Sequence, residues 1–325
     1  MDTAIAAKAL VKTYPKGVRA LDGVSFDVAA GSVFGLVGPN GAGKSTTVKI
    51  LTTLSRPDRG EAFVAGIDVL RRPDRVRRAI GCVAQSSGVD VNATGRENML
   101  LQGRLYDMAG RVLEERVDAL LERFGLAEAA RRVTRTYSGG MQRKLDVAMG
   151  LIHRPEVLFL DEPTTGLDPE ARADMWTEIE RLAAEEGLTI LLTTHYLEEA
   201  DRLTRQLAIV DQGKVVAQGT PGELKSELRG DAVHIELDAP DSDGHVVAAL
   251  APLGEVHDVT IEHGRLLHAR ADDGARAVPV MLQALEGEGL AVVSVTVARP
   301  SLDDVYLRHT GRRFAEADAA SEASR

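Results

Sequence analysis

The chain has 325 residues, 44% of them hydrophobic, and its 49 acidic and 39 basic residues give a formal net charge of −10. This length predicts two domains, and the acidic balance argues against nucleic-acid binding through bulk positive charge. Cys82 is the only cysteine, which excludes an intrachain disulfide and favours a reducing, cytoplasmic setting. No stretch approaches the roughly 18 apolar residues of a membrane span, and no signal peptide is visible. A membrane role would therefore require a partner.

Strand patterns and turn glycines fill residues 4–37, and Tyr14 follows the first of these strands. An aromatic ring offers a stacking face to a nucleotide base, so Tyr14 is a candidate for base contact. From the sequence alone, a half-buried strand tyrosine explains Tyr14 equally well.

Residues 38–46 fit the pattern G-x-x-x-x-G-K-[ST] between a strand pattern at 33–37 and a helix pattern at 45–54. Glycines let a backbone wrap a polyphosphate, and the inward N–H groups and the helix start add positive potential. Lys44 is expected to reach the β- and γ-phosphates of a bound nucleotide, and the Ser45 hydroxyl to hold Mg²⁺. The predicted nucleotide-binding residues of this loop are Gly38, Pro39, Asn40, Gly41, Ala42, Gly43, Lys44, Ser45 and Thr46.

A strand pattern at 80–84 ends at Gln85, whose neutral amide would touch Mg²⁺ or an attacking water. Taken alone this signal is weak, because most strand-end glutamines are surface residues. Cys82 is expected to be buried in this strand. The pattern then turns helical after a capping box at residues 94–97, which predicts a helical lobe at about 94–152 inserted in a nucleotide-binding core.

A second glycine-rich helix start follows, in which Ser138 caps the helix and Gly139 and Gly140 expose the first N–H groups. The next apolar strand ends in Asp161 and Glu162, which strand alternation sends to different sides. Asp161 is expected to hold Mg²⁺ through water. Glu162 is expected to face the γ-phosphate and to polarise the attacking water.

A turn containing Asp168 then precedes a long helix, and His195 follows a buried strand at 189–193. Ligands of parallel α/β sheets bind at the carboxyl ends of the strands, so His195 is placed to hydrogen-bond the γ-phosphate. A lone histidine without that setting is more often a bystander.

The order of patterns over residues 230–310 is βαββαβ, which predicts a small ferredoxin-like α+β domain with a coupling or assembly role. A last helix is expected at 302–310, and the small, polar residues 311–325 predict a disordered tail. The histidines of this region are interpreted as solvated surface residues rather than metal ligands; they are His234, His245, His257, His263 and His268.

Six motifs in order resemble the ATP-binding subunit of ABC transporters over residues 4 to about 225. They are the P-loop at 38–46, Gln85 as the Q-loop, 138–142 as the signature, 158–162 as the Walker B strand, 166–168 as the D-loop and His195 as the switch histidine. The resemblance implies an α/β P-loop core and an adenine-stacking role for Tyr14. It also implies ATP contacts from Ser138, Gly139, Gly140, Met141, Gln142 and Asp168. The signature departs from the commonest L-S-G-G-Q form at Tyr137 and Met141.

The resemblance further implies a head-to-tail dimer, in which ATP on Lys44 of one copy is covered by residues 138–140 of the other. Two helix N-termini and Mg²⁺ neutralise a triphosphate only when both surfaces close. Residues 94–98, 137–141 and 300–307 resemble the daunorubicin-resistance branch of drug and antibiotic efflux ATPases. That branch implies a separate integral-membrane permease of the ABC-2 type and a peripheral location at the cytoplasmic face of the membrane.

Two alternatives share the catalytic motifs. A soluble ABC-type ATPase acting on ribosomes or DNA usually has two nucleotide-binding units per chain or a long coiled coil, and this sequence has neither. An importer subunit is disfavoured only by the tail element at 300–307 and by the subfamily resemblance. The predicted divisions are an ATP-binding domain at 4–228, the accessory domain at 230–310 and the tail.

Overall fold

The computed structural model describes residues 2–228, 230–241 and 244–323. The chain divides into two compact units, one made of Met1–Pro221 with His309–Arg325 and the other of Gly222–Arg308. This division differs from the sequence-based one, because helix α8 (Pro221–Ser226) falls almost wholly in the second unit and the C-terminal residues return to the first.

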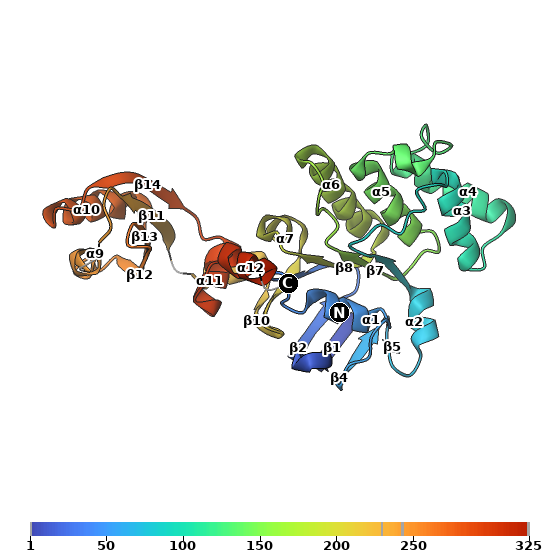
Figure 1. Ribbon diagram of the computed structural model, residues 1–325, viewed down its shortest axis with the longest axis horizontal. Helices are drawn as coiled ribbons and strands as arrows, with labels where there is room; N and C mark the ends of the chain where they lie inside the picture. Colours follow the sequence, from blue (N-terminus) through green and yellow to red (C-terminus); the bar gives the residue numbers. More distant parts are fainter. Residues whose placement is uncertain (1, 229, 242–243, 324–325) are drawn as a thin grey trace. The chain divides into compact units, whose positions relative to one another are not determined.

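A six-stranded sheet forms the centre of the first unit, in the order β10-β9-β3-β8-β7-β6 (Figure 1). Its five strands β9, β3, β8, β7 and β6 are parallel, and β10 pairs antiparallel with β9 at one edge. The bounds are β3 (Val33–Val37), β6 (Ile80–Val83), β7 (Val157–Asp161), β8 (Thr189–Thr194), β9 (Gln206–Asp211) and β10 (Lys214–Gly219).

An antiparallel sheet in the order β2-β1-β4-β5 and a set of helices complete this unit. The strands are β1 (Thr3–Thr13), β2 (Arg19–Ala29), β4 (Arg59–Val64) and β5 (Ile67–Asp68). The helices are η1 (Pro15–Gly17), α1 (Lys44–Leu51), α2 (Pro73–Ala79), α3 (Gly95–Leu105), α4 (Gly110–Arg123), η2 (Thr134–Thr136), α5 (Gly139–Gly150), α6 (Pro169–Glu186) and α7 (Leu197–Leu203).

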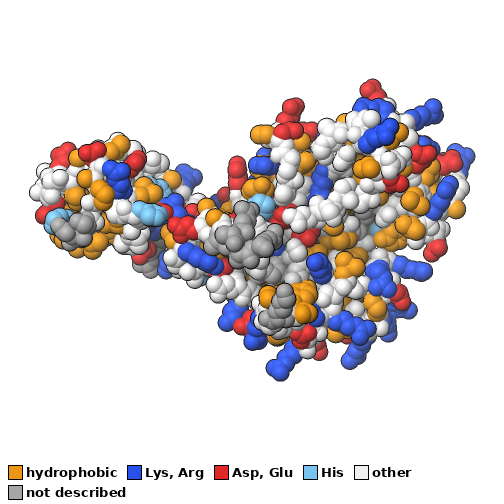
Figure 2. All heavy atoms as spheres, viewed as in Figure 1, with side chains coloured by type: hydrophobic (Ala, Val, Ile, Leu, Met, Phe, Trp, Pro, Cys, Tyr) orange, Lys and Arg blue, Asp and Glu red, His pale blue; other side chains and the backbone are white. Residues whose placement is uncertain are grey.

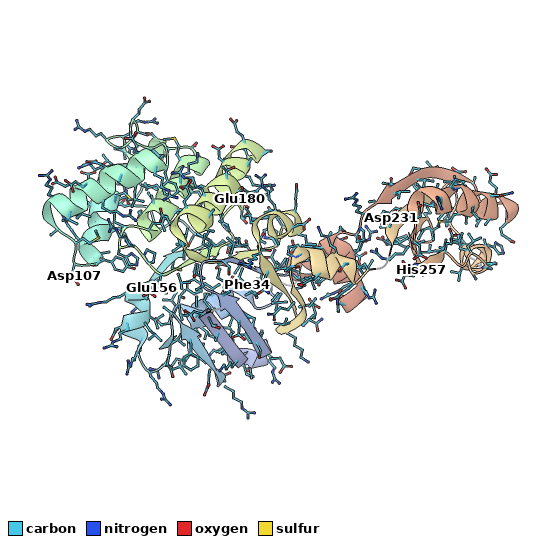
Figure 3. All side chains as sticks on the ribbon, turned by 180° about the vertical axis from the view of Figure 1, so that it is seen from behind. Phe34, Asp107, Glu156, Glu180, Asp231 and His257 are labelled. Atoms are coloured by element: carbon cyan, nitrogen blue, oxygen red, sulfur yellow. The ribbon has the colours of Figure 1, made fainter. Side chains whose placement is uncertain are left out.

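Alternating side chains of the central strands fill two separate cores. Leu158 and Leu160 of β7 face the core built with α4, α5 and α6, whereas Val157 and Phe159 face the core built with α1 and the antiparallel sheet. Phe34 of β3 belongs to the second core, inside the unit (Figure 3). The α/β core with both sheet faces covered confirms the predicted fold class.

The start of α3 confirms the predicted capping box. The Thr94 hydroxyl accepts a hydrogen bond from the Glu97 N–H, and the Glu97 carboxylate accepts one from the Thr94 N–H at 2.8 Å. The prediction that Cys82 is buried is wrong, because Cys82 is exposed. It lies on β6, an edge strand, and an apolar pattern does not distinguish an edge strand from a central one.

The second unit has the predicted βαββαβ order and the sheet order β12-β13-β11-β14, with every neighbouring pair antiparallel. Its elements are β11 (Asp231–Leu237), α9 (His245–Leu250), β12 (Val256–Glu262), β13 (Leu266–Ala271), α10 (Gly274–Gly287) and β14 (Val292–Ala298). One core joins α9 and α10 to the sheet through residues such as Val233, Leu267 and Met281. This arrangement confirms the ferredoxin-like prediction.

The histidine interpretation needs a correction at two positions. His268 is buried, and its Nδ1 lies 2.6 Å from Nδ1 of His234, its cross-strand neighbour on β11. His245 and His263 are exposed, as expected. Within residues 2–228, 230–241 and 244–323, no group of three or more His, Cys, Asp or Glu side chains is placed to hold a metal ion.

The C-terminal residues form two helices, α11 (Leu302–Thr310) and α12 (Phe314–Ala323). Helix α12 replaces the disordered tail that the small, polar composition predicts, because Phe314 and Ala317 are buried on one side of it. In the described part of the chain, no helix is long and apolar enough to cross a membrane.

Candidate active site

The loop between β3 and α1 is shaped by glycines. Gly43 has φ of 110°, and a Cβ at this position would lie 2.6 Å from the carbonyl oxygen of Ala20. Gly41 also has a positive φ, of 76°. Both positions need glycine for conformation, and Gly43 also needs it for space. The loop and the start of α1 thus have the backbone shape with which such segments surround an anion.

Lys44 begins α1 and is buried, with 4% of its surface exposed. Its Nζ donates to the carbonyl oxygens of Gly38 at 2.5 Å and Pro39 at 3.1 Å, and lies 3.7 Å from Glu162 Oε1. Burial lowers the pKa of Lys44, and the carboxylates of Glu162, Asp318 and Asp161 partly offset that effect. The ammonium therefore stands inside the loop, held by carbonyls that a phosphate group would replace.

Glu162 follows β7 in an unusual backbone conformation, with φ of 50°. Its N–H donates to the Thr193 carbonyl and to the Thr193 hydroxyl oxygen, both at 3.1 Å. A left-handed conformation in a residue other than glycine costs free energy, and such conformations concentrate at functional sites. The neighbouring strand β8 thus fixes the direction in which the Glu162 carboxylate points.

Side chains from four segments converge on that carboxylate. Gln85 Nε2 donates to Oε2 at 3.0 Å and the Thr165 hydroxyl donates to Oε2 at 3.3 Å, while His195 Nδ1 lies 3.3 Å from Oε1. Burial would raise the pKa of Glu162, but His195 and Lys44 together outweigh it and lower the pKa below its usual value. The structure thus gathers Lys44, Gln85 and His195 around an ionised Glu162.

Asp161 and Ser45 meet beside this cluster. The Ser45 hydroxyl lies 3.5 Å from Asp161 Oδ1, and the Thr193 hydroxyl donates to the same oxygen. Hydroxyl and carboxylate oxygens are the donor type that Mg²⁺ takes in nucleotide sites, so this pair fits the metal assigned to it. Gln85 instead turns its amide nitrogen toward Glu162.

Arg143 is a buried residue of this site that the sequence does not reveal. From α5 it donates to the carbonyl oxygens of Pro163 at 2.8 Å and Ala84 at 2.7 Å, and to those of Asp161 at 3.0 Å and Glu162 at 3.1 Å. One guanidinium therefore fixes both the residue before Gln85 and the backbone of the two carboxylates. Nothing in the local pattern of α5 predicts this, since the partners lie about 20 and 59 residues away in sequence.

The residues at the start of α5 contact neighbouring residues of the same unit. Ser138 caps α5 by accepting from the Met141 N–H at 3.2 Å, as predicted, and Met141 packs against the core beneath α4 to α6. The Gln142 amide donates to the Thr134 carbonyl at 3.2 Å, and Asp168 caps α6 through the Ala171 N–H at 2.9 Å.

Figure 1 shows α5 and α1 on opposite faces of the six-stranded sheet. The two cores agree, since Leu145 of α5 belongs to one and Val48 of α1 to the other. Tyr14 lies at the end of β1, with Lys12 Nζ 5.7 Å from its ring centroid. Its adenine contact and the ATP contacts of residues 138–142 and Asp168 stay predictions.

Two family models match the chain. Residues 21–165 match the ABC transporter family, and residues 219–310 match the C-terminal domain described as ATP-binding protein DrrA1-3-like. The Streptomyces coeruleorubidus daunorubicin resistance ATP-binding protein DrrA3 is 46% identical over 97% of this chain and 99% of that protein. The chain belongs to the daunorubicin-resistance type of ABC transporter ATP-binding proteins.

Other relatives and solved structures agree with this membership. The daunorubicin/doxorubicin resistance ATP-binding protein DrrA of Streptomyces peucetius is 45% identical over 95% of this chain and 92% of that protein. The structure of an ATP-binding subunit of an ABC transporter matches with a TM-score of 0.62 and 29% identity, covering 69% of this chain and 92% of that one. A dimeric ATP-binding cassette in a post-hydrolysis state, bound to ADP and phosphate, matches with a TM-score of 0.61 and 26% identity, covering 66% and 98%.

As an ABC transporter ATP-binding protein, the chain binds ATP, and its activity is ATP hydrolysis coupled to transport. The solved structures cover 69% and 66% of this chain. The family match at 219–310 includes the ferredoxin-like domain.

Proposed function

We propose that this chain powers export of a hydrophobic drug or antibiotic through a separate membrane permease of the ABC-2 type, at the cytoplasmic face of the membrane. The names of its relatives support export of such a compound, since they include daunorubicin resistance and linearmycin resistance ATP-binding proteins. The observation that carries the catalytic part is the convergence of Lys44, Gln85 and His195 on the Glu162 carboxylate.

Glu162 is the residue that would orient and deprotonate the attacking water. Its lowered pKa keeps it ionised, and the Thr193 and Arg143 contacts to its backbone hold the carboxylate in one direction. Lys44 would exchange its two loop carbonyls for phosphate oxygens, and His195 lies at the edge of the sheet where the γ-phosphate would end. Mg²⁺ held by Ser45 and Asp161 would neutralise charge on the phosphates.

The working form would be a head-to-tail dimer. Helices α1 and α5 start on opposite faces of the sheet, so the Ser138–Gly140 end of one copy is suited to a second copy's phosphate loop (Figure 1). Ser138 caps the first turn of α5 through the Met141 N–H. The N–H groups of Gly139 and Gly140 belong to the same first turn, where a helix has no carbonyl partner for them and an anion could accept from them. A similar solved ATP-binding cassette, bound to ADP and phosphate, is dimeric, which supports a dimer.

The permease would dock on the helical lobe. Large apolar side chains are exposed on α3 and α4 and just before α3; they are Val91, Leu101, Leu105 and Val112. Figure 2 shows hydrophobic side chains at the surface of the region that carries these two helices. The segment also begins a few residues after Gln85, so movement of Gln85 would reach the docked partner through a short length of chain.

The test is ATP turnover by this chain reconstituted in vesicles with a candidate permease, with a hydrophobic drug added or withheld. We expect drug to stimulate turnover several-fold only when the permease is present, and Leu105→Glu to abolish that stimulation while drug-free turnover stays the same. Stimulation that is independent of the permease, or that persists in Leu105→Glu, would contradict the proposal and its docking surface respectively.

A further inference from the structure

The phosphate loop already has an anionic partner in this chain. The Asn40 N–H donates to Asp318 Oδ1 at 2.8 Å, although these two residues are 278 positions apart. Asp318 also acts on Lys44, because its negative charge raises the pKa of the ammonium against the effect of burial. A carboxylate thus lies where the loop presents a backbone N–H group and a buried cation, the two features by which such loops hold phosphate.

Helix α12, which carries Asp318, is anchored to the first unit on both sides of its start. Phe314 and Ala317 are buried with 6% and 3% of their surfaces exposed. Ahead of the helix, the Arg312 guanidinium donates to both oxygens of Asp211 at 2.9 and 3.1 Å. Asp211 ends β9, the strand beside β3, and β3 leads into the phosphate loop. The contact at Asn40 is therefore one part of a docked helix rather than a single surface pair.

We propose that α12 is a built-in competitor of the nucleotide, in which Asp318 occupies an anion position of the phosphate loop until a polyphosphate displaces it. The competition follows from charge. The Asp318 carboxylate accepts from Asn40 N–H and its charge acts on Lys44, and the terminal phosphates of ATP would use the same N–H group and the same cation. Two anions held this close together repel each other. This inference rests on ATP binding at the loop, and it does not depend on the exported substrate.

Displacing Asp318 from the phosphate loop would weaken the apparent affinity for ATP. A protein whose binding-competent state is only a fraction of the population binds its ligand more weakly by that fraction. Helix α12 follows α11 after a few residues, and most of α11 belongs to the C-terminal unit. A movement of α11 would therefore change how firmly α12 is held at the phosphate loop. The position of α12 would then set the ATP concentration at which half of the nucleotide sites are occupied.

The test is the dissociation constant for ATP, measured by calorimetry on the full-length chain and on Asp318→Asn. Asn is close in shape to Asp and lacks its charge, so we expect ATP affinity to rise about 3- to 10-fold. Glu316→Gln is the matched control, since it removes one charge from the same helix, and Gln can still accept the hydrogen bond that Glu316 takes from the Arg313 N–H. We expect the control to match the unaltered chain.

A second variant that ends at Arg313 lacks α12 altogether and should bind ATP as tightly as Asp318→Asn. A synthetic peptide of residues 312–325 should then weaken ATP binding to this shortened chain, and the same peptide with Asn at position 318 should weaken it less. Unchanged or lower ATP affinity in both variants would overturn the inference and leave the proposed export function untouched. A full-length chain that binds no ATP would overturn both.

Discussion

The two units of this chain both bury charged side chains, and they use them differently. In the first unit, the Glu162 carboxylate lies among Lys44, Gln85 and His195, which come from separate segments, and its own backbone is in a strained conformation. In the second unit, buried Arg270 of β13 pairs with Asp304 of α11 at 3.5 Å. The first arrangement holds a charge ready for a reaction, and the second fastens a helix to a sheet.

The two buried charges differ in whether their partners can be exchanged. Asp304 is satisfied locally, because its carboxylate also accepts from the N–H and the hydroxyl of Ser301 at the start of α11. Glu162 instead depends on groups that would move when a nucleotide enters, such as Lys44, whose present partners are loop carbonyls. Buried charge alone is therefore a poor sign of function, whereas buried charge with exchangeable partners is a good one.

Among substitutions of these buried charges, we expect the largest loss of ATP turnover at Glu162. Glu162→Gln keeps the shape and removes the base, so turnover of ATP should fall on the order of 10²-fold or more while ATP binding persists. Turnover and equilibrium ATP binding, measured on the same preparation, check this. Glu198→Gln changes an exposed carboxylate of α7, the helix that follows β8, and should leave turnover unaltered. Normal hydrolysis by Glu162→Gln would remove this residue from the reaction.

A smaller effect is expected at Arg143, which positions Glu162 without touching the nucleotide. Lysine cannot bridge the same carbonyl groups, so Arg143→Lys should lower kcat about 10-fold and change KM for ATP little. The matched control is Arg116→Lys, because Arg116 also donates to two backbone carbonyls, those of Leu151 and Ile152, away from the site. Equal kinetic losses in both variants would mean that Arg143 has only a structural role.

The smallest effect on activity is expected in the second unit, where the charge is structural. Asp304→Asn leaves Arg270 buried without its ion pair and should lower the free energy of unfolding of this unit by about 2 kcal/mol. Denaturant unfolding checks this, with Glu286→Gln, an exposed carboxylate of α10, as the control. Basal ATP turnover of Asp304→Asn should equal that of the unaltered chain. A loss of turnover at unchanged stability would show that the contrast between the units is wrong.

Local sequence patterns predicted many of the helices, strands and caps, because these depend mainly on neighbouring residues. The strand before the phosphate loop, the capping box at Thr94 and the βαββαβ order all depend on residues close in sequence or on simple periodicity. The family motifs predicted the fold and the family, which the comparisons confirm.

The features that the sequence did not predict depend on contacts between segments that are far apart in the chain. In the sequence, Arg143 is one of several basic residues on a helix. Its role follows from the hydrogen bonds that its guanidinium donates to the carbonyl oxygens of Ala84 and Glu162. Helix α12 has a composition typical of disorder, and that composition does not predict the burial of Phe314 and Ala317 in the first unit. The exposure of Cys82 follows from strand order, which periodicity does not encode.

The most direct test of the shared site mixes two inactive variants. Lys44→Ala has no working phosphate loop, and Ser138→Arg has a blocked helix start, so neither forms a complete site with itself. If ATP is held between the loop of one copy and the Ser138 end of another, an equal mixture should recover about a quarter of normal turnover, from one intact site in each mixed dimer. Turnover that never exceeds the sum of the two variants alone would contradict this account.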